Sequence, residues 1–401
     1  MMEKEFLFGK IKELAKKHFP EIKAIREYLH AHPELSFKEF NTSAFISRKL
    51  NQFGITHQTG VAGTGIVGLI KGKNSSQEVI LLRADMDALP IQEQNNVHYK
   101  STSEGVMHAC GHDVHSACLL GALLIIQELI DELPVQVKFI FQPGEEVLPG
   151  GASLMIKEGI LENPKVNKAV ALHVFPSLET GNIGFKSGMY MASTDEIYIS
   201  VKGKGGHAAM PEDYTNPLLV ASDLLLKLNS DFMLNKIHQF DEFKNTPTVL
   251  AFGKIQGLGA TNVIPESVNL EGTFRTMNEN WRSKAHQEIL NTAKEIERKW
   301  NAKIDVQFCK GYPFLVNHAE TTENIKTMAE NYLGKNHVVE LPIRMTAEDF
   351  AYISQKVNSC FFRLGTGNKS KNITSGVHTS TFNIDEQAME IGSSIMALAC
   401  F

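Results

Sequence analysis

The sequence has no long apolar stretch, which argues against a helix that crosses a membrane. Its most apolar run, residues 119–130, contains Gln127 and Glu128 and falls short of the ~20 residues that a spanning helix needs. Residues 1–20 are charged and lack the apolar segment of a signal peptide. We therefore expect a cytoplasmic protein that does not associate with membranes.

Cysteine is scarce and irregularly placed, at positions 110, 118, 309, 360 and 400. An odd number without regular spacing is typical of free thiols in a reducing compartment and argues against a disulfide framework. A strong excess of one charge is also lacking, because 40 Lys and Arg stand against 45 Asp and Glu, a formal net charge of −5. The basic residues form no patch, so we expect no nucleic-acid partner.

The composition is that of an ordinary globular protein, with 43% hydrophobic and 21% charged residues. The 401 residues exceed one typical core, so we expect two domains. Between residues 60 and 190, short apolar runs typical of strands alternate with helical patterns such as 117–130. This alternation predicts an α/β fold, with helices on both faces of a mixed and largely buried sheet.

The pattern changes over residues 192–310. The order there is strand, helix, strand, strand, helix, strand, which predicts a small α+β unit of the ferredoxin-like type. After residue 311 the first pattern returns. We therefore expect a discontinuous domain formed by residues 1–191 and 311–401, with a smaller domain, 192–310, inserted into it.

Residues 107–115 (Met-His-Ala-Cys-Gly-His-Asp-Val-His) concentrate side chains that bind metals. The four candidates are Cys110, His108, His112 and His115. Thiolate and imidazole are ligands of zinc-like divalent ions. Cys110 and His112 flank Gly111, so in an extended segment both side chains would point the same way. Spacing alone does not decide which histidines bind, because His108 and His115 compete with His112.

Two adjacent acids, Glu145 and Glu146, follow an apolar strand-like run at 135–141. Neighbouring carboxylates repel each other unless a cation or a shared proton relieves them. One acid bound to a metal and one acting as a proton shuttle would satisfy that condition, whereas the alternative is a solvated loop. The position after a buried strand favours the functional interpretation, and with residues 107–115 it indicates a metallohydrolase.

Three further features are ambiguous when taken alone. His173 lies in the apolar run 169–175 and, taken alone, is more typical of a core histidine; His378 lies in a loop from which a distant ligand could complete a metal site, but alone it does not indicate one. The Gly-rich turn at 202–207 lacks the Gly-Lys-Ser/Thr ending of a P-loop, so we expect no nucleotide site there.

Several segments, in the same order throughout, carry a resemblance to a known family. They are 83–90 (Arg-Ala-Asp-Met-Asp-Ala-Leu-Pro), 108–115, 141–146, 203–211, 262–265 and 272–276. From about His30 to the C-terminus, the chain resembles the aminoacylase and hippurate hydrolase family. That family includes indole-acetyl-amino-acid hydrolases and belongs to peptidase family M20.

The resemblance implies a zinc-exopeptidase-like catalytic domain with a two-metal centre, and an inserted lid domain that mediates homodimer contacts. The implied metal ligands are Cys110, His112, Glu146, His173 and His378. Glu145 is then the general base, and Asp87 orients groups of the metal site without binding a metal itself. Zinc, manganese, cobalt and nickel are all compatible with such ligands.

The resemblance also assigns three residues of the inserted segment. His207 stabilises the oxyanion of the tetrahedral intermediate, in its own or the partner subunit's active site, and Asn262 and Arg275 hold the free α-carboxylate of the substrate. Without the resemblance, His207 would be interpreted as an exposed turn histidine and Arg275 as a charge on the sheet surface. Glu212 and Asn216 depart from the common family pattern, which affects lid-edge and substrate contacts only.

These inferences predict an enzyme that hydrolyses the amide bond of N-acyl amino acids to a carboxylate and a free amino acid. The alternatives are a dipeptidase or carboxypeptidase, or an N-acetyl-diaminopimelate deacetylase, using the same two divalent ions. Two non-hydrolase alternatives are a metal-binding relative without catalytic activity and a redox protein that uses the Cys110 thiol.

Overall fold

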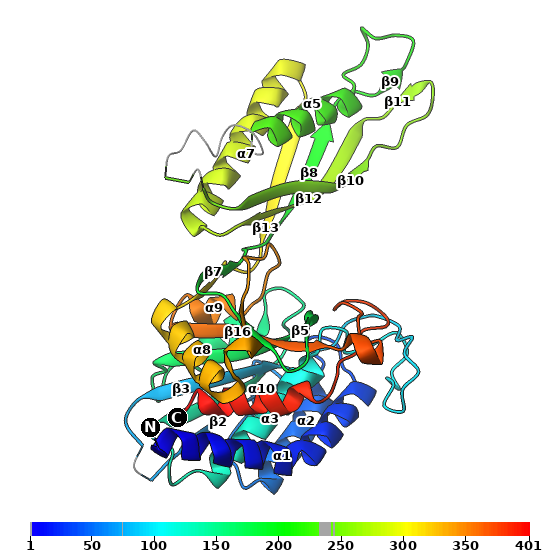
Figure 1. The fold of residues 1–401 in the computed structure, drawn as a ribbon. Helices are drawn as coiled ribbons and strands as arrows, with labels where there is room; N and C mark the ends of the chain where they lie inside the picture. The colour runs from blue at the N-terminus through cyan, green and yellow to red at the C-terminus, as the bar shows by residue number, and fades with distance from the viewer. Residues whose placement is uncertain (1, 74, 232–241, 244) are drawn as a thin grey trace. The chain divides into compact units, whose positions relative to one another are not determined.

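The computed structural model describes residues 2–73, 75–231, 242–243 and 245–401 (Figure 1). The chain divides into two compact units. Unit 1 comprises Met1–Met189, Val316–Ile343 and Asp349–Phe401, and unit 2 comprises Tyr190–Leu315 and Arg344–Glu348. That residues 192–310 fold as a separate domain stays a prediction.

Unit 1 contains an eight-stranded mixed sheet with strand order β1-β2-β4-β3-β5-β16-β6-β15. The strands are β1 (His57–Val61), β2 (Gly65–Lys71), β3 (Val79–Asp85), β4 (Gln136–Gln142), β5 (Lys168–Glu179), β6 (Ile183–Phe185), β15 (Val338–Glu340) and β16 (Asn358–Gly367). The four central strands, β4, β3, β5 and β16, are parallel to their neighbours within that group. β3 and β4 are buried along their whole length, as expected for parallel strands covered on both faces.

Helices cover both faces of this sheet. One face packs on α1 (Met2–Ala31), α2 (Phe40–Gln52), α3 (His112–Glu128), α8 (Ala319–Leu333) and α10 (Ala388–Leu398), which share one apolar core with Leu82 and Leu172. Successive strand residues point to opposite faces, and Arg83 accordingly lies against the ring of Phe350 on the other side. α4 (Gly151–Lys157) and α9 (Ala351–Ser354) lie over that side.

Unit 2 is built on a four-stranded antiparallel sheet with strand order β10-β12-β8-β13. Its elements are β8 (Asp195–Lys202), α5 (Pro217–Ser230), β10 (Thr248–Gln256), β12 (Ser267–Thr276), α7 (Glu279–Trp300) and β13 (Lys303–Lys310). α5 and α7 share one core with alternate residues of β8 and therefore cover the same face. The mixed sheet with helices and the smaller antiparallel unit confirm the predicted fold class.

Short elements complete the two units. β9 (Gly206–His207) pairs with β11 (Val263–Ile264) in unit 2. β7 (Gly188–Met191) and β14 (Leu315–Asn317) lie where the chain passes between units, and η2 (Lys335–His337) and η3 (Lys369–Lys371) are single turns. Among the described residues, no helix combines the length and the apolar character needed to cross a membrane.

Side chains that could bind a metal ion or take part in catalysis lie near the carboxyl ends of the parallel strands of unit 1. Asp85 ends β3, Gln142 ends β4 just before the two acids, and His173 lies in β5. Ligands bind beyond this end of the strands in open α/β sheets, so the fold gathers these residues where a site is expected.

Candidate metal centre

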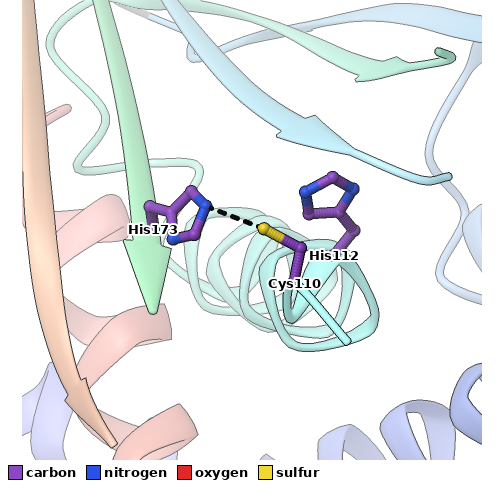
Figure 2. A group of neighbouring side chains, drawn as sticks. All are labelled: Cys110, His112 and His173. Carbon is purple, nitrogen blue, oxygen red and sulfur yellow. Dashed lines mark hydrogen bonds between the residues drawn. The ribbon is translucent and has the colours of Figure 1, made fainter. Parts of the chain in front are cut away.

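A glycine turn places the first two candidate ligands. Gly111 has a φ of 85°, and α3 begins directly after it, at His112. A Cβ atom at position 111 would lie 2.6 Å from Cγ2 of Val174, so both the backbone conformation and the available space require glycine. The expected extended segment is therefore wrong, as is a helix starting only at 117, but Cys110 and His112 still face one site (Figure 2).

Two groups of potential ligands share Cys110. The first is Cys110, His112 and His173, and the second is Cys110, Glu146 and His378; within each group the ligand atoms lie within 4.8 Å of one another. Sγ of Cys110 is 3.4 Å from Nε2 of His173, and Nε2 of His378 is 3.3 Å from an oxygen of Glu146. The structure thus brings together all five residues that the sequence proposes as ligands.

His378 reaches the group from a segment far along the chain. Its backbone N–H donates to the carbonyl of Ala109 at 2.7 Å, which ties this loop to the turn that carries Cys110. His378 is also one of the few non-glycine residues with a positive φ, 61°. This backbone hydrogen bond explains how a residue about 270 positions away joins the site.

The histidine rings present Nε2 to the centre because their other nitrogens are occupied. Nδ1 of His173 donates to the carbonyl of Val174 at 2.8 Å, and Nδ1 of His112 donates to Oδ1 of Asp87 at 3.1 Å. Among the described residues, Nε2 of His112 is buried and has no hydrogen-bond partner. A buried nitrogen left without a partner fits a bound cation.

The electrostatics of the centre also fit a cation. Burial lowers the pKa of His173 well below its ordinary value, and the nearby Arg363 lowers it further, which favours the neutral imidazole that binds metals. Burial and the carboxylate of Glu146 raise the pKa of the Cys110 thiol. A thiolate at this position therefore needs a positive charge beside it, as a metal ion would supply.

Asp87 holds two parts of the site at once. While Oδ1 accepts from His112, Oδ2 accepts the backbone N–H of Glu146 at 3.0 Å and the hydroxyl of Ser36 at 2.6 Å. Asp87 is buried, with 1% of the residue exposed. Its contacts suit the supporting role that the resemblance implies.

Glu145 lies beside both ligand groups. One of its oxygens lies within 4.8 Å of ligand atoms of His112 and Glu146, and Oε1 accepts the backbone N–H of Asp349 at 3.3 Å. The side chain is 7% exposed. The site therefore contains an acid that is not needed in either group built on Cys110.

The structure separates His112 from its two competitors. His108 is buried, both its nitrogens lack a hydrogen-bond partner among the described residues, and burial lowers its pKa to about 4. His115 uses both nitrogens, since Nδ1 contacts Oδ1 of Asp85 at 2.6 Å and Nε2 accepts the N–H of Val174 at 2.9 Å. His112 is the one that meets Cys110 and His173 in a common group.

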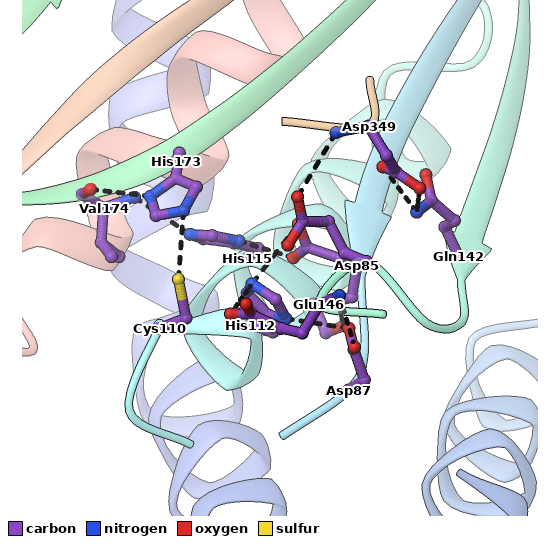
Figure 3. A network of polar contacts seen from close by, with 12 residues as sticks. Asp85, Asp87, Cys110, His112, His115, Gln142, Glu146, His173, Val174 and Asp349 are labelled. Carbon is purple, nitrogen blue, oxygen red and sulfur yellow. Dashed lines mark hydrogen bonds and ion pairs between the residues drawn. The ribbon is translucent and has the colours of Figure 1, made fainter. Parts of the chain in front are cut away.

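A buried polar network beside the centre was not identified from the sequence, and Figure 3 shows three of its members, Asp85, Gln142 and Asp349. Arg83 donates from Nη1 to Asp85 at 2.6 Å, from Nη2 to Asp349 at 2.8 Å, and from Nε to Gln142 at 2.9 Å. Gln142 in turn donates to both oxygens of Asp349. Arg83 and Asp85 could have indicated this network, because both lie in the motif at residues 83–90. No local pattern marks Asp349.

The three residues predicted to contact substrate lie in unit 2. His207 and Asn262 line one shallow pocket, where the N–H of Ala208 donates to the carbonyl of Asn262 at 3.1 Å. Arg275 is half-buried, which lowers its pKa, and Nη1 donates to the carbonyl of Met345 at 3.1 Å. Their roles toward substrate stay predictions.

Comparison with known proteins identifies the family. The model of peptidase family M20/M25/M40 matches residues 81–400. The N-acetyl-L-cysteine deacetylase of Bacillus subtilis is 35% identical over 365 residues, covering 91% of this chain and 84% of that protein. Thermostable carboxypeptidase 2 of Saccharolobus solfataricus is 34% identical over 377 residues, covering 93% of each chain.

A solved structure agrees with these matches. The crystal structure of the YXEP protein of Bacillus subtilis, described as a dinuclear metal-binding peptidase from the M20 family, aligns with a TM-score of 0.81. The two chains are 31% identical, and the alignment covers 96% of this chain and 98% of the other. The family predicted from the sequence motifs is confirmed: the chain is a hydrolase that belongs to peptidase family M20/M25/M40.

Proposed function

We propose that this protein hydrolyses the amide bond of N-acyl amino acids to a carboxylate and a free amino acid. The observation that carries the proposal is the pair of ligand groups that share Cys110, with the buried acid Glu145 beside them. The deacetylase of Bacillus subtilis, at 35% identity, supports a substrate of this class.

Two divalent ions would be held at this centre, one by Cys110, His112 and His173 and the other by Cys110, Glu146 and His378. When bound, such ions polarise a carbonyl group and lower the pKa of water. A site of sulfur, nitrogen and oxygen ligands accepts zinc, manganese, cobalt or nickel.

Glu145 is the proposed general base. It takes a proton from the attacking water and delivers it to the nitrogen of the leaving amine, so the proton lost on attack is returned on bond cleavage. The N–H of Asp349 donates to Oε1 of Glu145 at 3.3 Å, which helps to orient the carboxylate of the proposed base.

The residues of unit 2 would bind the remainder of the substrate. Asn262 and Arg275 hold its free α-carboxylate, and His207 stabilises the developing oxyanion, in its own subunit or in the partner's. We also propose a homodimer through this unit. Two features support this proposal: β10 is an edge strand of the unit 2 sheet, and Ile255 on β10 and Leu226 on α5 are exposed apolar side chains that could pack against a second copy.

A second candidate function is carboxypeptidase or dipeptidase activity, favoured by the similarity to the carboxypeptidase of Saccharolobus solfataricus. Purified, metal-loaded protein should be assayed side by side with hippurate, N-acetyl-methionine, N-acetyl-diaminopimelate and unblocked dipeptides. We expect kcat/KM to be at least about 10-fold higher for N-acyl monoamino acids, a difference of ~1.4 kcal/mol in transition-state binding. A preference for peptides or for N-acetyl-diaminopimelate would assign those functions instead, and bound metal without turnover would indicate an inactive relative.

A further inference from the structure

We propose that His115 is a positioning residue for the metal ligand His173. It accepts the hydrogen bond of the Val174 amide and thereby fixes the end of strand β5 that carries the ligand. This inference rests on the proposed function in one respect, since it requires that the centre built on Cys110 binds divalent ions.

The contacts of His115 fix which nitrogen carries the proton. Nε2 is 2.9 Å from the backbone nitrogen of Val174, which has a hydrogen to donate, so Nε2 is the unprotonated acceptor. Nδ1 is then protonated and donates to Oδ1 of Asp85 at 2.6 Å. Both bonds are buried, because His115, Asp85 and Val174 are each at most 1% exposed.

The peptide groups of Val174 connect His115 to His173. The N–H of Val174 is bound by His115, and the carbonyl of Val174 accepts from Nδ1 of His173 at 2.8 Å. That second bond turns Nε2 of His173 toward Sγ of Cys110, 3.4 Å away. A shift of the Val174 backbone would therefore move the ring that supplies the ligand atom.

His115 contacts β5 where its pairing with β3 has already ended. The last residues paired between these two strands are Arg83 and Ala171, three positions before Val174, whereas on its other edge Val174 is still paired with Leu364 of β16. Beyond that point lies Asp85, the last residue of β3, whose Oδ2 accepts from Arg83 at 2.6 Å. The imidazole of His115 then connects Oδ1 of Asp85 to the N–H of Val174. An anchored side chain thus replaces the missing strand contact on that edge.

His115 could instead be a ligand, because it lies with Asp85 and His112 in a third group of potential metal-binding atoms. Both of its nitrogens are already engaged, and both oxygens of Asp85 accept hydrogen bonds. Binding an ion there would break the bond to Val174 or the bond to Asp85. The contacts therefore favour positioning.

Two substitutions separate the two bonds of the ring. The amide of Asn reaches about as far as Nδ1 of His, so His115→Asn keeps a donor for Asp85 and loses the acceptor for Val174. The longer His115→Gln places its carbonyl near the position of Nε2, so it keeps the acceptor for Val174 and loses the donor for Asp85. Both variants are polar and similar in size, so each serves as the control for the other.

The experiment uses the full chain, stripped of metal by a chelator and titrated with Co²⁺. Calorimetry and the visible absorption of cobalt bound to thiolate report affinity and geometry without an activity assay. We expect His115→Asn to bind one of the two ions about 10–100-fold more weakly, which is the usual loss when a residue that orients a metal ligand is removed. His115→Gln should bind both ions within about threefold of the unaltered chain, a difference of under ~1 kcal/mol.

Each other outcome overturns the proposal. Equal affinities in both variants, or a larger loss in His115→Gln, would show that the Val174 bond does not matter, and loss of a whole ion in both variants would make His115 a ligand. If neither variant folds, hydrogen exchange on the unaltered chain decides, because rapid exchange of the Val174 amide in the apo protein would also contradict the role. An unaltered chain that binds no Co²⁺ would instead overturn the metal centre of the proposed function.

Discussion

The backbone N–H of Glu146 donates to Oδ2 of Asp87 at 3.0 Å, while Oδ1 of the same carboxylate accepts from Nδ1 of His112. Asp87 therefore aligns one proposed ligand from each of the two groups that share Cys110. A single buried acid two residues beyond the end of β3 holds together parts of α3 and the segment after β4.

Replacing Asp87 with alanine should weaken the binding of both metal ions. Loss of the acceptor frees the ring of His112 and leaves the N–H of Glu146 without its partner. We expect metal affinity to fall about 10–100-fold, measured by titration of the apo protein and by metal content after dialysis. Ser36→Ala is the matched control, since it removes only the hydroxyl that also donates to Asp87; an equal loss in that variant would contradict the alignment of the ligands by Asp87.

Replacing Glu145 with glutamine should separate catalysis from metal binding. The amide keeps the shape of the side chain but cannot accept the proton, so kcat should fall about 10²–10⁴-fold on N-acyl amino acids while KM changes little. Metal content should match that of the unaltered chain. Retained turnover would assign the base elsewhere, whereas loss of an ion would make Glu145 a ligand.

Removal of metal should abolish activity and lower thermal stability. The five proposed ligands come from four separate segments of unit 1, so an ion bound to the folded state alone stabilises it by mass action. We expect a stabilisation of about 3–4 kcal/mol at a hundred- to thousandfold excess of ion over its dissociation constant. Calorimetric melting before and after treatment with a chelator, followed by re-addition of Zn²⁺, Mn²⁺, Co²⁺ or Ni²⁺, measures this; an unchanged melting temperature would argue against a site in unit 1.

Protonation of Asp195 should lower the free energy of unfolding of unit 2 at acid pH. Burial alone would raise its pKa, but hydrogen bonds from Arg282 and His286 outweigh burial and hold the pKa at about 2. Because this value lies below the ~3.9 of an unfolded chain, the carboxylate stabilises the fold above pH ~4, and its contribution of about 1–3 kcal/mol is lost as the pH falls toward 2.

The Asp195→Asn variant tests this directly, since it removes one of the two carboxylates that pair with the buried guanidinium of Arg282, and Glu279 remains. Denaturant unfolding should show a loss of about 1–3 kcal/mol near neutral pH. The difference between the variant and the unaltered chain should shrink between pH 4 and 2. A difference that stays constant over this range would contradict the low pKa of Asp195.

The fold class could be predicted because its signals are local. Apolar runs of the length of strands alternate with helices in unit 1, and the change of pattern near residue 192 is close to the beginning of unit 2 at Tyr190. The return of Arg344–Glu348 to unit 2 had no such signal, because five residues carry no periodicity.

The site was predictable only in part for the same reason. Three histidines fall within residues 107–115, and spacing could not rank them, because the answer depends on a left-handed turn at Gly111. That turn starts α3 at His112 and places His115 one helical turn further on, next to Asp85. The link from Arg83 to Asp349 spans 266 positions, and no local pattern in the sequence could have revealed it.

Gly111 also limits how the centre can change. A single added methyl group would collide with the side chain of Val174, whose own peptide orients His173. The loop before α3 and the end of β5 therefore pack so closely that neither segment can be redesigned without the other. Attempts to exchange the sulfur ligand for another by grafting loops should keep this pair of positions fixed.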